Sequence, residues 1–105
     1  MNAPQVQHCA TMEEVRRHID ALDARIVSLL AERSGYVAQA ARIKQDAGQV
    51  YDQARIDFIV ERVKALAAQQ GAPEPVAEAT YRAMIDAFIA FERQEFARLR
   101  EGAQA

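Results

Sequence analysis

Three charged side chains fall on apolar faces of predicted helices, where an unpaired charge is costly. Counted at 100° per residue from Leu22, Arg33 lies at about 20° and Lys44 at about 40°, inside an apolar stripe from about −40° to +100°. Glu92 shares a later stripe with Phe88. None of the three has an opposite charge three or four positions away. Two cations and one acid leave a surplus positive charge, which favours binding of a small anion.

A plainer alternative is that these three groups form an ion pair between helices in the core, or extend their stems to reach water. Other charges differ from them in their local surroundings. Arg16 has acids at positions 13 and 20, and Arg55 has Asp52 three residues before it. Those two arginines are equally consistent with solvated surface pairs, each contributing a few tenths of a kcal/mol.

The chemistry open to such a site follows from the other residues of the chain. The sequence has no Ser/His/Asp arrangement, no metal-type cluster and no glycine-rich phosphate loop. Its histidines are His8 and His18, and His8 beside Cys9 is a poor metal site because both precede the first helix. We therefore expect no metal and no cofactor. The remaining chemistry is to bind an anion and to stabilise charge that develops on it.

The size of the anion follows from the helical spacing. Arg33 and Lys44 are eleven residues apart, about 16 Å along a helix axis. Long side chains converging from these two positions leave room for a molecule of about ten to twenty heavy atoms, between small residues such as Val37, Ala40 and Ala41. The spacing therefore favours a compact dicarboxylate.

A long first helix carries both cations. Thr11 followed by Glu14 is a capping-box pattern that predicts the helix start, and Gly48 is the first plausible stop. The predicted helix covers residues 11–47, about 55 Å. Gly35 offers a possible break into a hairpin, but the apolar stripe keeps its phase across it, which favours one unbroken helix. A compact domain of this size has a radius of gyration near 13 Å, so such a helix needs a partner chain.

Capping and proline patterns predict two further helices. Asp52 predicts the cap of a second helix that ends at Gly71, and Pro75 suits the first turn of a third helix that runs to about Arg100. No strand-like alternation occurs. We predict an all-α fold with three helices per chain in an intertwined homodimer. Residues 1–10 are expected to be a flexible N-terminal arm, residues 11–100 the helical domain, and residues 101–105 a C-terminal tail.

Composition limits the partners. Thirteen Lys and Arg against fifteen Asp and Glu give a net charge of −2, so neither nucleic acid nor an anionic membrane is expected to bind. The single cysteine, Cys9, excludes an intramolecular disulfide and suits a reducing compartment. No apolar run approaches a membrane span, and the start has no secretory pattern. We expect a soluble cytoplasmic protein.

The segment "VRRHIDALDARIVSLLAERSGYVAQAARIK", followed by "VYDQARIDFIVERV", resembles the all-helical chorismate mutase family. The similarity runs from about residue 12 to residue 98. It rests on the "IDALDxxIVxLLxER" run, a lysine eleven residues later, and "VYDxxR". The resemblance implies an intertwined dimer that converts chorismate to prephenate by a pericyclic shift, without a cofactor.

The resemblance also implies roles for individual residues. Arg33 and Arg16 match the arginines that hold the two carboxylates, with Arg16 reaching the site from the other chain. Lys44 matches the lysine that contacts the migrating ether oxygen. Asp52 and Arg55 match an aspartate and an arginine that line the pocket at the second helix. Arg16 and Arg33 are about 25 Å apart on one helix, so an antiparallel partner is needed to bring them together.

Three positions depart from the pattern usual in bacterial members. Ile56 stands where a glutamate commonly binds the ring hydroxyl, and Phe88 replaces a small polar residue. Glu92 stands where a glutamine often donates to the ether oxygen, so it must be protonated to do so; apolar neighbours favour that state and nearby cations oppose it. Alternatives are an isochorismate pyruvate-lyase, a mutase acting on an amino analogue of chorismate, and a non-catalytic helical dimerisation or regulatory module.

Overall fold

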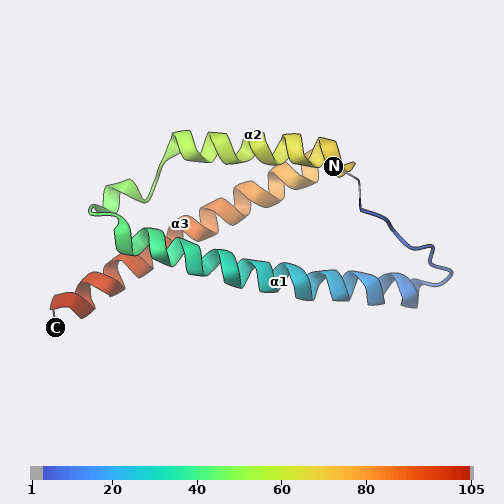
Figure 1. Ribbon diagram of the computed structural model, residues 1–105, viewed down its shortest axis with the longest axis horizontal. Coiled ribbons are helices and arrows are strands. Elements are labelled where there is room, and N and C mark those ends of the chain that lie inside the picture. The colour runs from blue at the N-terminus through green and yellow to red at the C-terminus, as the bar shows by residue number, and fades with distance from the viewer. Residues whose placement is uncertain (1–3, 105) are drawn as a thin grey trace.

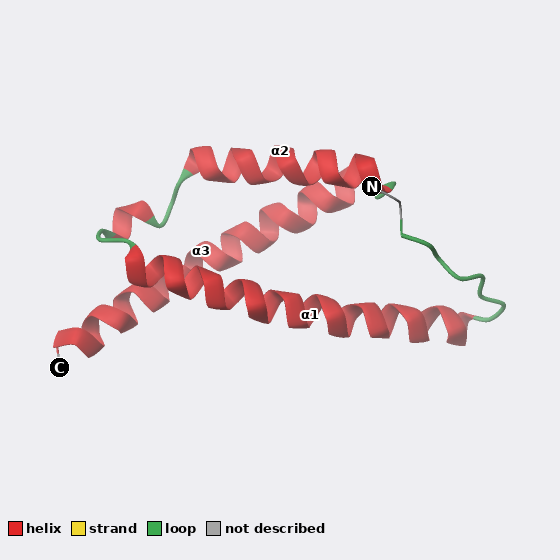
Figure 2. Cartoon of the chain, viewed as in Figure 1, coloured by secondary structure: helices red, strands yellow, loops and turns green. Residues whose placement is uncertain are grey.

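The computed structural model describes residues 4–104, and helices dominate this part of the chain (Figures 1 and 2). The elements are α1 (Met12–Ile43), a short 3₁₀ helix η1 (Ala47–Gln49), α2 (Gln53–Gln70) and α3 (Glu74–Gln104). Residues 4–104 contain no strand. The predicted all-α fold with three α-helices per chain, the first of them long, is therefore confirmed.

Local hydrogen bonds fix the start and the continuity of α1. The Thr11 side chain accepts from the Glu14 backbone N–H at 3.2 Å, and the Glu14 carboxylate accepts from the Ala10 N–H at 2.8 Å. These bonds satisfy N–H groups that have no partner within the helix. The helix passes Gly35 without a break, and the preceding Ser34 hydroxyl donates to a carbonyl one turn back. The prediction of one long helix is confirmed.

The C-terminal end of α1 differs from the prediction. The helix ends at Ile43, four residues before the predicted end, so that boundary is wrong. The Gln45 N–H donates to the Gln49 side chain at 2.9 Å, and the Gly48 N–H donates to the Asp46 carboxylate at 2.7 Å. Polar side chains thus take backbone donors that a longer helix needs, and the chain turns into η1 instead.

The caps of α2 match the sequence prediction. The Asp52 carboxylate accepts from the Arg55 backbone N–H at 3.1 Å, and Gly71 ends the helix in the left-handed region at φ 74°. Pro75 lies in the first turn of α3, as predicted. That helix continues to Gln104, past the predicted end near Arg100, so this boundary is also wrong.

The three helices form an open arrangement rather than a closed bundle. Helix α3 packs against both α1 and α2, while α1 diverges from α2 toward its own N-terminus (Figure 1). The molecule measures 59 × 28 × 21 Å with a radius of gyration of 17.5 Å, against about 13 Å for a compact domain of this length. None of the helices described here has the length and apolar content that crossing a bilayer requires.

The core of a single chain is small. Its buried apolar side chains are Ala41, Val50, Val60, Ala67 and Ile85. They lie where α3 meets the C-terminal part of α1 and the length of α2. The packed region therefore supports only one end of α1.

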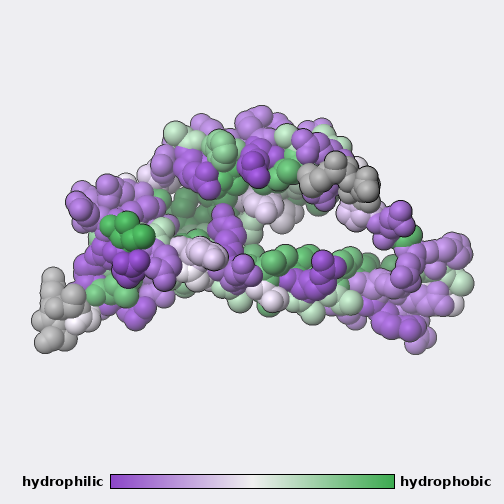
Figure 3. Space-filling view, in the orientation of Figure 1, coloured by the Kyte–Doolittle hydropathy of each residue, from purple (hydrophilic) through white to green (hydrophobic). Residues whose placement is uncertain are grey.

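The N-terminal part of α1 leaves its apolar stripe uncovered. Ile19, Leu22, Ile26 and Leu29 are between 49% and 62% exposed. Figure 3 shows apolar surface on α1 that faces the hollow between α1 and α2. Contiguous exposed apolar surface of this kind marks an interaction site more often than a solvated face.

Candidate active site

Five of the six predicted site residues line one cavity. This space, here called the polar cavity, has a volume of about 490 Å³ and lies between the C-terminal part of α1, the start of α2 and the middle of α3. Its charged lining residues are Arg33, Lys44, Asp52, Arg55 and Glu92. The volume falls in the ~300–1,000 Å³ range typical of small-molecule sites.

Lys44 and Glu92 face each other across helices α1 and α3. The Lys44 Nζ donates to Glu92 Oε2 at 2.6 Å, with the Lys44 side chain 28% exposed and the Glu92 side chain 10% exposed. The core ion pair considered as an alternative is thus present, and it borders the polar cavity instead of filling it. A pair this sheltered is electrostatically strong, and a ligand that enters must compete with it.

Arg33 lies against an aromatic ring. Its guanidinium carbon is 4.6 Å from the centroid of the Phe88 ring, a cation–π distance. Phe88 in turn packs edge-on against Phe91, with ring centroids 6.2 Å apart. Phe88, which departs from the pattern of the resembling family, therefore serves here as a platform that orients Arg33. The planar edge of a stacked guanidinium is suited to a carboxylate.

The Asp52 side chain contacts the Arg55 backbone at the start of α2. The Asp52 carboxylate caps the helix by accepting from the Arg55 backbone N–H, while the Arg55 guanidinium carbon lies 5.1 Å from the centroid of the Phe58 ring. Both residues are exposed, as the surface alternative expects, but within residues 4–104 their side chains form no ion pair with each other. Ile56, another departure from the family pattern, contributes to the apolar wall of the polar cavity.

The charges around the polar cavity do not balance. Arg33, Lys44 and Arg55 supply three positive charges, and Asp52 and Glu92 supply two negative ones, which leaves one positive charge. Apolar residues make up most of the remaining wall, while Asp52 and Arg55 lie at its exposed edge. A cavity of this composition favours a small anion with an apolar body.

Arg16 is the sixth predicted residue, and it lies elsewhere. It precedes Arg33 by seventeen residues on the same straight helix, about 25 Å along the axis. It is absent from the lining of the polar cavity. A single chain therefore does not bring it to the other five.

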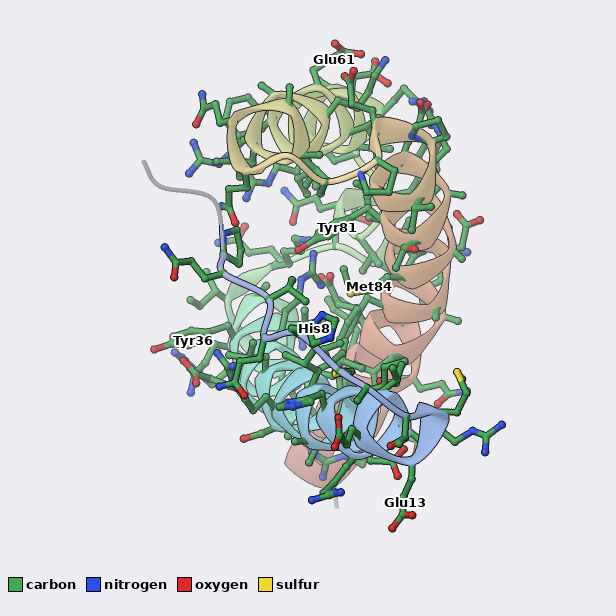
Figure 4. The ribbon with its side chains drawn as sticks, turned by 90° about the vertical axis from the view of Figure 1, so that its right-hand side faces the viewer. His8, Glu13, Tyr36, Glu61, Tyr81 and Met84 are labelled. Atoms are coloured by element: carbon green, nitrogen blue, oxygen red, sulfur yellow. The ribbon has the colours of Figure 1, made fainter. Side chains whose placement is uncertain are left out.

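Sequence reasoning missed several residues at this site. Tyr36 and Val50 also line the polar cavity, Tyr36 being largely exposed (Figure 4). Arg100 on α3 binds backbone carbonyls at the end of α1. The four-residue spacing of Phe96 and Arg100 is a weak signal for their stacking, but no local pattern indicates which backbone groups Arg100 reaches.

A second, apolar cavity of about 750 Å³ lies between α1 and α3. Its wall includes Ile26, Leu29, Tyr81, Met84 and Phe91. Figure 4 shows Tyr81 and Met84 extending from α3 into the space between the helices. No group of three His, Cys, Asp or Glu side chains suited to a metal ion occurs within residues 4–104.

The sequence model of the type II chorismate mutase family matches residues 15–93, about three quarters of the chain. The chain belongs to the type II chorismate mutase family. A relative named chorismate mutase, from Methanocaldococcus jannaschii, is 27% identical over 84 residues, which cover 79% of this chain and 85% of the relative. The resemblance drawn from residues 12–98 is confirmed, and the chain is an enzyme of the chorismate mutase type. The matched range contains Arg16 and every charged residue of the polar cavity.

Proposed function

We propose that this chain converts chorismate to prephenate, a step in phenylalanine and tyrosine biosynthesis, as an intertwined homodimer. The observation that carries the proposal is the convergence of Arg33, Lys44, Asp52, Arg55 and Glu92 on one cavity with surplus positive charge. Membership of the type II chorismate mutase family supports the same reaction. It does not favour the lyase, the amino-analogue mutase or the non-catalytic module.

The dimer is supported by what a single chain leaves uncovered. The stripe from Ile19 to Leu29 is half exposed, and the apolar cavity beside it has the wall chemistry of a helix-packing surface. An antiparallel α1 from a second copy would cover both surfaces. The same arrangement would carry Arg16 of the partner subunit toward the polar cavity, because the two arginines are about 25 Å apart along the helix.

The charge balance supports a dicarboxylate substrate. With Glu92 ionised, the polar cavity of one chain carries one surplus positive charge, and Arg16 of the partner subunit would raise this to two, which two substrate carboxylates would neutralise. The protonated Glu92 of the reaction step described below would leave one further positive charge, which would face the negative charge that grows on the ether oxygen. In this proposal Arg33 holds one carboxylate against its Phe88 platform, and Arg16 of the partner subunit holds the other. Binding at both ends restricts chorismate to the compact conformer that reacts.

The reaction is a concerted rearrangement in which a C–O ether bond breaks while a C–C bond forms. Negative charge grows on the ether oxygen in the transition state, and Lys44 is placed to stabilise it. The Lys44 ammonium would leave its contact with Glu92 for the ether oxygen. A protonated Glu92 would donate a second hydrogen bond there. The charged groups lining the cavity with Glu92 are Lys44 and Arg33 from α1, and Asp52 and Arg55 from the start of α2.

The identity of the substrate can be tested directly. Purified protein is incubated separately with chorismate and with isochorismate, and the products are identified by NMR. We expect prephenate from chorismate. Formation of salicylate and pyruvate from isochorismate would favour the lyase, and no turnover of either compound would favour the non-catalytic module.

Mixing two inactive variants tests the shared site. Arg16→Ala and Arg33→Ala chains, unfolded together and refolded, form mixed dimers in about half of the cases, and one of the two sites in each mixed dimer has both arginines. About a quarter of the parent activity should return. If activity does not rise above that of the separate variants, Arg16 of the partner subunit does not belong to the site.

A further inference from the structure

Arg100, near the end of α3, binds the C-terminal end of α1. One guanidinium nitrogen donates to the Ala41 carbonyl at 2.6 Å, and the other terminal nitrogen donates to the Lys44 carbonyl. The guanidinium carbon lies 3.6 Å from the centroid of the Phe96 ring, one turn earlier on α3. Arg100 is therefore fixed between an aromatic face and two backbone acceptors.

The Ala41 and Lys44 carbonyls lack their usual partners, because the N–H groups that would bind them in a longer helix donate to other acceptors. In a continued helix, Ala41 would accept from the Gln45 N–H, and Lys44 would accept from the Gly48 N–H. The Gln45 N–H donates to Gln49 and the Gly48 N–H donates to Asp46. Ala41 is fully buried, so water cannot replace the missing donor. A guanidinium also suits a helix C-terminus, where the carbonyl dipoles favour a positive charge.

Helix α3 consequently holds Lys44 at two points. Glu92 binds its ammonium group at 2.6 Å, and Arg100 binds its backbone carbonyl. The two α3 residues are eight positions apart, about 12 Å along the axis, and eight positions is close to two whole turns. They therefore lie on one face of α3, with Phe96 between them.

We propose that Arg100 is a positioning residue for Lys44, which it acts on through the backbone without touching the substrate. This inference rests on the proposed mutase function. When substrate draws the Lys44 ammonium away from Glu92, the contact on the carbonyl keeps the C-cap, at φ −62° and ψ 140°, in place. Loss of Arg100 therefore lets Lys44 drift from the ether oxygen, while Arg33 still binds a carboxylate.

The principal variant is Arg100→Met, which keeps an apolar stem over Phe96 and removes both donors. Its matched control is Arg98→Met, because Arg98 lies on the same helix, is 67% exposed and pairs only with Glu95 in the described chain. We expect Arg100→Met to lower kcat about tenfold to a hundredfold, as a displacement near 1 Å does, with KM changed less than about threefold. Arg98→Met should match the parent in both constants.

A second background separates positioning from general loss of structure. Arg100→Met is combined with Lys44→Met and assayed at raised enzyme concentration. We expect no further loss of kcat, because the side chain being positioned is already gone. A structural defect would lower kcat by the same factor in both backgrounds, and this result would overturn the proposal. A rise in KM at constant kcat, or unchanged constants in Arg100→Met, would also overturn it.

Arg100→Lys covers the case in which Arg100→Met does not fold. A lysine keeps the positive charge at the end of α1 but lacks the planar fork that reaches two carbonyls. We expect a smaller loss of kcat, with the circular-dichroism melt of the parent retained; parent kcat in this variant contradicts the need for two donors. A parent protein that does not convert chorismate would refute the proposed function, whereas an active parent with an unaffected Arg100→Met refutes this inference alone.

Discussion

The two ends of α1 differ in what covers them. Its C-terminal end packs against α3, contains the fully buried Ala41 and contributes Arg33 and Lys44 to the polar cavity. Its N-terminal end presents Ile26 and its neighbours half exposed, and carries Arg16 away from that cavity. One chain thus places two cations of an anion site on one half of a helix and leaves the apolar residues of the other half about half exposed.

This difference assigns association to one end of α1 and substrate binding to the other. Apolar residues at the N-terminal end remain about half exposed and are available for a second copy. Cations at the C-terminal end are sheltered by the chain's own α2 and α3. Substitutions at the first end should therefore act on association, and substitutions at the second on chemistry.

The largest effect is expected for Ile26→Asp. The carboxylate would be buried without a partner if a second copy covers this stripe, which costs several kcal/mol. We expect loss of the dimer in light scattering and a fall in activity of more than about a hundredfold. Val76→Asp is the control, because Val76 is 61% exposed against 52% for Ile26 and lies at the start of α3, where an acid is favourable.

A dimeric and active Ile26→Asp would contradict the assignment of the N-terminal end to association. Disruption by Val76→Asp as well would indicate an interface at a different face of the molecule. Both variants are first checked for helical content by circular dichroism.

The next largest effect is expected for Arg33→Ala. It removes a charge-assisted contact to a substrate carboxylate, so kcat/KM should fall by at least about ten- to a hundredfold while the dimer remains. Arg42→Ala is the matched control, since Arg42 lies on the same part of α1 and its guanidinium binds the Gln39 side chain. Equal activity in the two variants would show that the polar cavity does not hold the substrate.

Glu92→Gln should retain most of the parent kcat. In the proposed mechanism Glu92 donates a hydrogen bond to the ether oxygen, and an amide at the same position also donates one. Steady-state kinetics with chorismate test this, and a fall in kcat of more than about tenfold in Glu92→Gln would remove Glu92 from the donating role.

The smallest effect is expected for Gly35→Ala, between the two ends of α1. Nothing lies within 4 Å of a Cβ added at this position, and the helix is regular there. Alanine should stabilise the helix by about 1 kcal/mol, which raises Tm by a few degrees. A lower Tm would reveal a close approach by a second copy at this position.

Local signals were sufficient to predict most of the helices. Thr11, Asp52 and Gly71 act at the caps where the sequence indicates, because capping depends on neighbouring residues alone. The end of α1 was missed because Gln45 to Gln49 offers two competing hydrogen-bond patterns. The carbonyls that the turn leaves free are bound by Arg100, more than fifty residues later, and no local pattern indicates this contact.

The charges of the candidate site were predictable for a similar reason. Arg33, Lys44 and Glu92 stand out because each lies on an apolar stripe and has no opposite charge three or four positions away in the sequence. Their pairing across helices is a tertiary property: the sequence left open whether Lys44 and Glu92 would contact each other, and it gave no indication that Phe88 stacks on Arg33. Arg16 lies outside the polar cavity of a single chain, so its place at the site is part of the dimer proposal.

The uncovered stripe of α1 also has a consequence for how the protein behaves on dilution. If the two copies complete each other's sites, folding and assembly are one equilibrium, so stability follows the law of mass action. Thermal midpoints would then rise with protein concentration. Specific activity would fall at protein concentrations below the dissociation constant of the dimer. The activity of such an enzyme would increase with its own concentration.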